Sequence, residues 1–127
     1  MLTPKQFNYA FANTLDAAEA AEAYARLPIP GPARPLFQAA FANVNPNAVT
    51  KVNYKNDDRA PLLLLAAGDD HVMPVSVSKA AFKRQSKSKA KTELKVYPGR
   101  SHDIVGERGC EAVADHALDW AERNAAS

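Results

Sequence analysis

One aliphatic run that ends abruptly in polar turn residues limits what this chain can fold into. Residues 62–74 read LLLLAAGDDHVMP, so the run stops at Gly68 and two carboxylates, a histidine and a proline follow. A short apolar run bounded by turn residues predicts a strand buried on both faces of a sheet. Ligands of open α/β sheets bind just past the carboxyl ends of such strands. Asp69, Asp70 and His71 fall at that point.

A second stretch, KVYPGRSH at residues 95–102, repeats this arrangement, because it also predicts a strand that leads directly into a loop with a histidine. The elements expected from residue 61 onward are a strand, a helix, a strand and a helix, over residues 61–67, about 75–87, 93–97 and about 110–124. This order predicts an α/β fold with two parallel strands joined by a right-handed crossover.

The first 47 residues predict helices and loops, with no strand. Thr3 and Gln6 have the spacing of a capping box at the start of one helix, and the alanine-rich segment 17–27 favours a second. Prolines predict a loop over residues 28–35. A third helix is expected over residues 35–43, with four side chains on its buried side: Leu36, Phe37, Ala40 and Phe41.

The two motifs together resemble one family. A-G-D-D-H-V-M-P, followed a little over twenty residues later by Y-P-G-R-S-H, is similar to the closing third of an α/β-hydrolase. The resemblance implies that Asp70 is the acid and His102 the base of a Ser-His-Asp triad, in the chain order typical of the family. The Asp70 carboxylate should then lie about 3 Å from an imidazole nitrogen of His102.

The same resemblance implies a single partial domain in three parts. A helical cap-like region would span residues 1–47, a linker residues 48–60, and the C-terminal part of the hydrolase core residues 61–127. It also implies small ester or acyl compounds as substrates.

The resemblance breaks down at the nucleophile, which in the family lies in a G-x-S-x-G elbow. The glycines of this chain, at 31, 68, 99, 106 and 109, include no pair four residues apart with a serine between them. The family's oxyanion-hole loop is missing too. We therefore expect the isolated chain to be inactive unless an N-terminal half completes it. The alternatives are a non-catalytic, truncated hydrolase remnant or an oligomerising interaction module, and a basic binding domain.

Several neighbouring residues have competing interpretations. Asp69 and Asp70 also suit a turn or a helix cap, and His71 suits a loop hydrogen bond better than base catalysis. Ser101 adjoins the histidine and is a poor nucleophile, whereas Cys110 fits a packed helix start better than a reactive thiolate. Six basic residues suit either phosphate binding or a solvated helix face: Lys79, Lys83, Arg84, Lys87, Lys89 and Lys91.

Composition adds exclusions. A net charge of +2 over 127 residues requires no anionic partner, and without a Gly-rich phosphate loop we expect no nucleic-acid partner. A lone cysteine gives neither an internal disulfide nor metal-ligand spacing, so no metal and no cofactor is expected. No signal peptide and no apolar run near the roughly 18 residues of a membrane span is found, which predicts a cytoplasmic protein.

The predicted sheet also bears on assembly. The strand over residues 61–67 is apolar on both faces but has one confident neighbour, which leaves an unpaired edge. We therefore expect a homo-oligomer that buries Leu62–Leu65, or docking of the missing N-terminal half.

Overall fold

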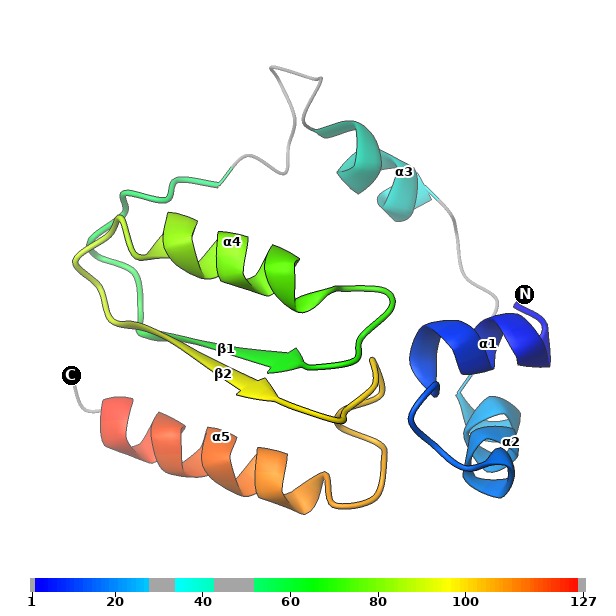
Figure 1. Ribbon diagram of the computed structural model, residues 1–127. Helices are drawn as coiled ribbons and strands as arrows, with labels where there is room; N and C mark the ends of the chain where they lie inside the picture. The colour runs from blue at the N-terminus through cyan, green and yellow to red at the C-terminus, as the bar shows by residue number, and fades with distance from the viewer. Residues whose placement is uncertain (1, 28–33, 43–51, 126–127) are drawn as a thin grey trace.

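The computed structural model describes residues 2–27, 34–42 and 52–125. Its centre is a two-stranded parallel sheet with one helix on each face (Figure 1). The predicted strand–helix–strand–helix order is confirmed, and its elements are β1 (Leu62–Ala67), α4 (Val75–Gln85), β2 (Thr92–Tyr97) and α5 (Glu111–Asn124).

The strand register brings the two polar loops together. β1 and β2 run parallel, with Leu62 opposite Thr92 and Ala67 opposite Tyr97. The ladder continues past the strands, because the Gly68 N–H donates to the Tyr97 carbonyl at 2.8 Å and the Asp69 N–H to the Arg100 carbonyl at 2.9 Å. The loops that follow β1 and β2 therefore leave the same edge of the sheet side by side.

Burial of β1 is less complete than its sequence predicts. Ala66 and Ala67 are buried, but Leu62–Leu65 remain partly exposed. The prediction of a strand buried on both faces was therefore wrong for its first four residues. The physical reason is that, within the described ranges, β1 has only β2 as a neighbour, so its other edge carries no cover.

A single arginine joins the amino ends of both strands to the end of α4. The Arg59 guanidinium donates hydrogen bonds to four carbonyl oxygens and to one hydroxyl, those of Ala60, Gln85, Ala90, Lys91 and Thr92. The Ser88 hydroxyl also donates to the Asn56 carbonyl at 2.7 Å. Residues 56–59, which lie in the predicted linker, are thus bound to the sheet domain.

The first N-terminal helix, α1 (Pro4–Phe11), begins where the Thr3 and Gln6 capping box predicts, and the second, α2 (Ala17–Arg26), begins with the alanine-rich segment 17–27. Both capping boxes are formed, with Thr3 and Asp16 as the N-caps. The two helices share a small core of Phe7, Ala12, Ala20 and Ala23, against which pack Phe11, Leu15 and Tyr24. The core is small because the two buried residues of α2 are both alanines, Ala20 and Ala23.

The third helix, α3 (Arg34–Phe41), forms at the predicted place but without the predicted burial. Phe37 and Phe41 are 58% and 62% exposed. The expectation that they face a core was therefore wrong, because an amphipathic pattern indicates a buried face only where another element covers it. The side chains of Leu36 and Ala40 and the loop at residues 28–33 lie outside the described residues. In the part of the chain that the structure describes, no helix is long and apolar enough to cross a membrane.

Candidate acid–histidine site

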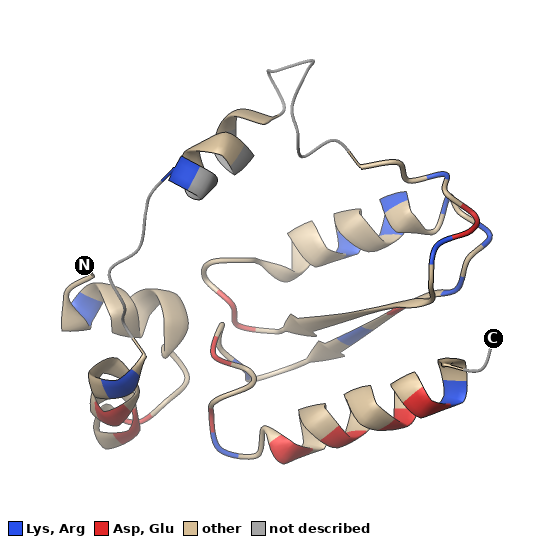
Figure 2. Ribbon diagram, turned by 180° about the vertical axis from the view of Figure 1, so that it is seen from behind, with Lys and Arg blue, Asp and Glu red and all other residues tan. Residues whose placement is uncertain are grey.

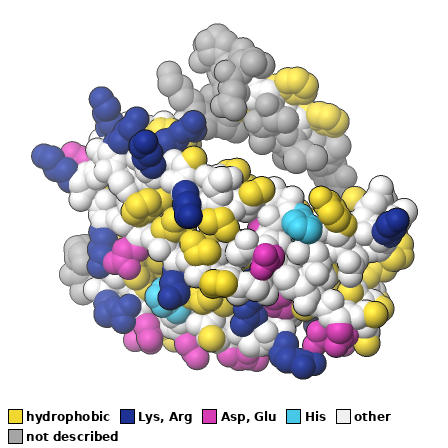
Figure 3. Space-filling model, viewed as in Figure 1, with side chains coloured by type: hydrophobic (Ala, Val, Ile, Leu, Met, Phe, Trp, Pro, Cys, Tyr) yellow, Lys and Arg dark blue, Asp and Glu magenta, His cyan; other side chains and the backbone are white. Residues whose placement is uncertain are grey.

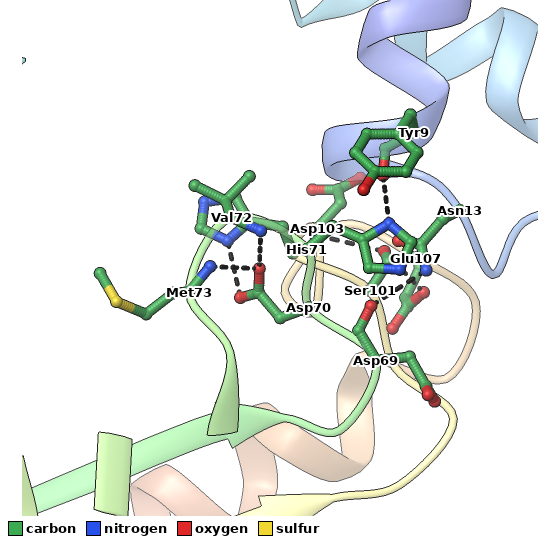
Figure 4. Close-up of polar contacts among 11 residues, drawn as sticks. Tyr9, Asn13, Asp69, Asp70, His71, Val72, Met73, Ser101, Asp103 and Glu107 are labelled. Atoms are coloured by element: carbon green, nitrogen blue, oxygen red, sulfur yellow. Dashed lines mark hydrogen bonds and ion pairs between the residues drawn. The ribbon is translucent and has the colours of Figure 1, made fainter. Parts of the chain in front are cut away.

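Asp70 lies in the loop between β1 and α4, and its two carboxylate oxygens have different partners. Oδ1 accepts the N–H groups of Val72 and Met73, each at 2.7 Å, in a local turn (Figure 4). Such side-chain to backbone bonds are the reason aspartate favours tight turns. They fix the carboxylate and leave Oδ2 available to a partner from another loop.

That partner is His102, in the loop after β2. Its Nδ1 lies 2.7 Å from Oδ2 of Asp70, so the contact that the sequence predicts between these side chains is present. The Asp70 side chain is 8% exposed and that of His102 is 32% exposed. The edge of the Phe11 ring packs against the imidazole, with ring centroids 4.9 Å apart and planes at 75°. Among the described residues, none forms a hydrogen bond with His102 Nε2.

The electrostatics define the state of this pair. Burial acts to raise the pKa of Asp70, but hydrogen bonds from Met73, His102 and Val72 together outweigh it and lower the pKa below 3.8. Asp70 is therefore ionised at neutral pH. Because an ionised carboxylate only accepts hydrogen bonds, the Nδ1 of His102 must carry the proton between them. In the neutral imidazole the lone pair is then on Nε2.

The loop that carries His102 has its own buried polar network. The Ser101 hydroxyl is fully buried and donates to Oε2 of Glu107 at 3.2 Å, and the Thr14 hydroxyl donates to the same oxygen at 3.0 Å. Arg100 donates to the carbonyls of Arg108 and Gly109, each at 2.7 Å. Sequence analysis did not single out Glu107 or Arg100, because the contacts that they make within the loop follow no period and Thr14 lies 93 residues from Glu107.

The neighbouring candidates have structural partners. His71 Nδ1 lies 2.7 Å from the Tyr9 carbonyl, and the two rings are 4.6 Å apart. His71 thus joins the Asp70 loop to α1, as the loop hydrogen-bond interpretation expects. The Asp69 side chain is exposed, while its carbonyl accepts the Asn13 amide at 3.0 Å. Figure 4 shows the contact between the His71 ring and the Tyr9 carbonyl.

The remaining candidates lie away from the pair. Cys110 precedes α5 as a partly buried free thiol. The six basic residues of the second half of the fold, Lys79, Lys83, Arg84, Lys87, Lys89 and Lys91, are all exposed. In the ribbon, basic residues recur on α4 and in the segments beyond its end, and acidic residues recur along α5 (Figure 2). Within the described residues, no cluster of histidine, cysteine and carboxylate side chains could hold a metal ion.

Comparison with protein families assigns this architecture to the α/β-hydrolases. The family model described as serine aminopeptidase, S33, matches residues 36–109, which is more than half of the chain. The chain belongs to this family. The matched span includes β1, α4, β2, Asp70 and His102, whereas α1, α2 and α5 lie outside it. Comparisons with curated proteins and with solved structures gave no match.

Proposed function

We propose that this chain supplies the acid and the base of a Ser-His-Asp triad in an α/β-hydrolase that acts on small ester or acyl substrates. The observation that carries the proposal is the 2.7 Å contact between Asp70 Oδ2 and His102 Nδ1. The two residues follow successive parallel strands at the same edge of the sheet. Family membership over residues 36–109 supports hydrolase chemistry of this general kind.

The proposed roles follow from the protonation states. Ionised Asp70 holds the Nδ1–H of His102 and stabilises the imidazolium that forms during reaction. Nε2 accepts the proton of the nucleophile's hydroxyl while that oxygen attacks the acyl carbon. The same proton then passes from Nε2 to the leaving group as its bond to the acyl carbon breaks. The backbone bonds from Val72 and Met73 keep Asp70 in place during both steps.

The proposal places the nucleophile outside these 127 residues. The sequence contains no G-x-S-x-G. Ser101, the nearest serine in sequence to the base, is 0% exposed and donates to Glu107, so its oxygen cannot meet a substrate. A further segment, joined or separate, must bring the serine and the oxyanion donors to the edge where Asp70 and His102 lie.

We also propose that α1 and α2 belong to a cap over this site. Three contacts support it: Phe11 packs on His102, His71 bonds to the Tyr9 carbonyl, and Asn13 donates to the Asp69 carbonyl. Each contact joins the helical region to one of the two site loops. In a hydrolase, a cap in this place shapes the acyl pocket and excludes water.

Activity of the isolated chain tests whether the nucleophile lies outside these 127 residues. With a chromogenic ester, we expect no turnover above that of the His102→Ala variant, because a base without a nucleophile lacks the covalent step. Turnover that a serine-reactive phosphonate abolishes would show a nucleophile within the 127 residues and would contradict the proposal.

The reading frame upstream of Met1 provides a second test. If it encodes a G-x-S-x-G, the joined protein should hydrolyse the ester. Substitution His102→Ala or Asp70→Asn should then lower kcat on the order of 10³–10⁴-fold or more, as in other triads. Full activity of both variants would exclude the proposed roles.

A non-catalytic interaction module is the second candidate function. The observation that favours it is a set of half-exposed apolar side chains beside the site, Val72, Met73 and Val77. Figure 3 shows hydrophobic side chains gathered on the face that carries α4. If the chain is such a module, its binding to a partner protein or to a second copy survives the substitution His102→Ala, and no esterase activity appears with any upstream segment.

A further inference from the structure

We propose that Glu107 is a positioning residue for His102, which holds the histidine loop against the helical region so that the imidazole reaches Asp70. This inference rests on the proposed function, because positioning matters only if His102 acts as the base. Glu107 touches no reacting atom and would act through the backbone on either side of His102.

The first argument is the burial and the bonding of the Glu107 carboxylate. Its side chain is 4% exposed. Oε2 accepts the Thr14 and Ser101 hydroxyls, and Oε1 lies 3.6 Å from the Arg100 guanidinium. Removing the donors of a buried carboxylate is costly. Glu107 therefore joins two segments, the connection between α1 and α2, where Thr14 lies, and Arg100 and Ser101, which directly precede His102.

The second argument concerns the backbone around His102. On one side, Ser101 is tied to Glu107 by its hydroxyl. On the other side, the Asp103 N–H donates to the Phe11 carbonyl at 3.1 Å. The Phe11 ring also packs on the imidazole. Both neighbours of His102 are therefore bound to the α1–α2 region. Asp103 bonds to it directly, and Ser101 bonds to it through Glu107.

The consequence is a coupling between the helical region and the acid–base pair. If the bonds of Glu107 to Thr14 and Ser101 are lost, residues 101–103 gain freedom and the imidazole spends less time on Asp70. The lowered pKa of Asp70 depends in part on that bond, so it reports the coupling. A purely structural carboxylate would change the stability of the fold without changing this local signature.

The test uses two variants of the full chain. Thr14→Val is nearly isosteric and removes only the hydroxyl that joins the helical region to Glu107. Glu107→Gln removes the carboxylate charge. Their matched controls are Ser86→Ala, whose hydroxyl bonds to the Phe82 carbonyl at the end of α4, and Glu111→Gln at the exposed start of α5.

Three quantities are measured in each variant: the NMR signal of the His102 Nδ1 proton, the titration midpoint of the Asp70 carboxyl, and the thermal unfolding midpoint. In folded Thr14→Val and Glu107→Gln, we expect the proton signal to broaden or disappear and the Asp70 midpoint to rise toward 3.8. The controls should match the wild type. If Glu107→Gln does not fold, Thr14→Val decides the test.

Two results would overturn the inference, and the second would also overturn the proposed function. A wild-type Nδ1 signal that stays unchanged in the folded variants would reject the positioning role of Glu107 and leave the proposed function intact. A wild-type chain in which Nδ1 carries no proton would remove the acid–base pair, and both proposals would fail.

Discussion

Asp70 does two separate tasks with one carboxyl group. Oδ1 closes the turn after β1 through the N–H groups of Val72 and Met73, and Oδ2 receives the imidazole of His102. The turn interpretation of this residue is therefore confirmed, and the contact with His102 that the acid interpretation requires is present. Asp70 does not cap α4, which begins after Pro74 without a side-chain cap. The local turn holds the carboxylate in the position from which Oδ2 meets His102.

The first prediction concerns Asp70→Asn and its pH dependence. At pH 7 we expect the variant to lose about 1–3 kcal/mol of unfolding free energy, because the neutral amide weakens bonds that a charge strengthens. The folded pKa of Asp70 lies below its unfolded value, so this stabilisation is fully present above about pH 4–5. It is lost as the pH falls through the folded pKa. Urea denaturation at several pH values measures the difference.

Asp69→Asn is the matched control, because that neighbouring carboxylate is exposed. It should leave the unfolding free energy within about 0.5 kcal/mol of the wild type. Equal effects of the two substitutions, or a difference at Asp70 that does not shrink as the pH falls through the range in which its carboxyl is protonated, would contradict this assignment of charge.

The sequence predicts the contact between Asp70 and His102, but it gives no indication of the contacts that Glu107 makes with the histidine loop. Asp70 and His102 each lie in the loop after a recognisable strand, so their motifs are local and their contact follows from the parallel pairing of the strands. Glu107 gives no such signal, because its hydroxyl donors are residue 14 and residue 101. Contacts of that kind depend on tertiary packing, which no short pattern encodes.

At the scale of elements, the close approach of the two site loops depends on Gly68. A Cβ at this position would lie 2.8 Å from Pro98 Cα and 3.0 Å from the Tyr97 carbonyl oxygen. Both atoms are backbone and cannot move aside as a flexible side chain would. The loops can therefore lie side by side only if residue 68 has no side chain.

The second prediction is that Gly68→Ala pushes the loops apart. We expect a loss of about 1–3 kcal/mol of unfolding free energy, typical of overpacking, and a weaker NMR signal from the His102 Nδ1 proton. Gly99→Asn is the control, because a Cβ at Gly99 meets no atom within 4 Å and asparagine tolerates its positive φ of 72°. A Gly68→Ala variant as stable as Gly99→Asn would show that the loops are not closely packed.

The residues at which helices begin agree best with the sequence patterns, and the burial of individual side chains agrees least. The capping box of α1 forms as predicted because Thr3 and Gln6 are only three residues apart. The exposed Phe37 and Phe41 of α3 and the partly exposed Leu62–Leu65 of β1 did not follow prediction. A pattern identifies the face that is apolar, but the presence of a covering element depends on the rest of the fold.

At the scale of the whole molecule, one edge of the sheet, along the apolar strand β1, has no neighbouring strand among the described residues. Within the described ranges β1 pairs only with β2, and Val72, Met73 and Val77, in the loop after β1 and the first turn of α4, are about half exposed. A two-stranded sheet is marginal by itself. Apolar surface and an unpaired strand edge together favour association.

The third prediction is therefore a homodimer or higher oligomer at micromolar concentration that buries Leu62–Leu65. Sedimentation velocity of the 127-residue chain measures it, and a mass of at least twice the chain's 13.7 kDa is expected. Addition of a docking N-terminal half should compete with self-association, because both would cover the same edge. A compact monomer that binds no hydrophobic dye would contradict this view of the sheet.

The measurement that tests the central claim most directly is nitrogen-15 NMR of His102 at a pH where its imidazole is neutral. An acid–base pair made by Asp70 and His102 predicts a proton on Nδ1 and a lone pair on Nε2, and it predicts that Asp70→Asn abolishes this preference. A wild-type chain with the proton on Nε2, unchanged by Asp70→Asn, would contradict the claim that Asp70 orients His102 for base catalysis.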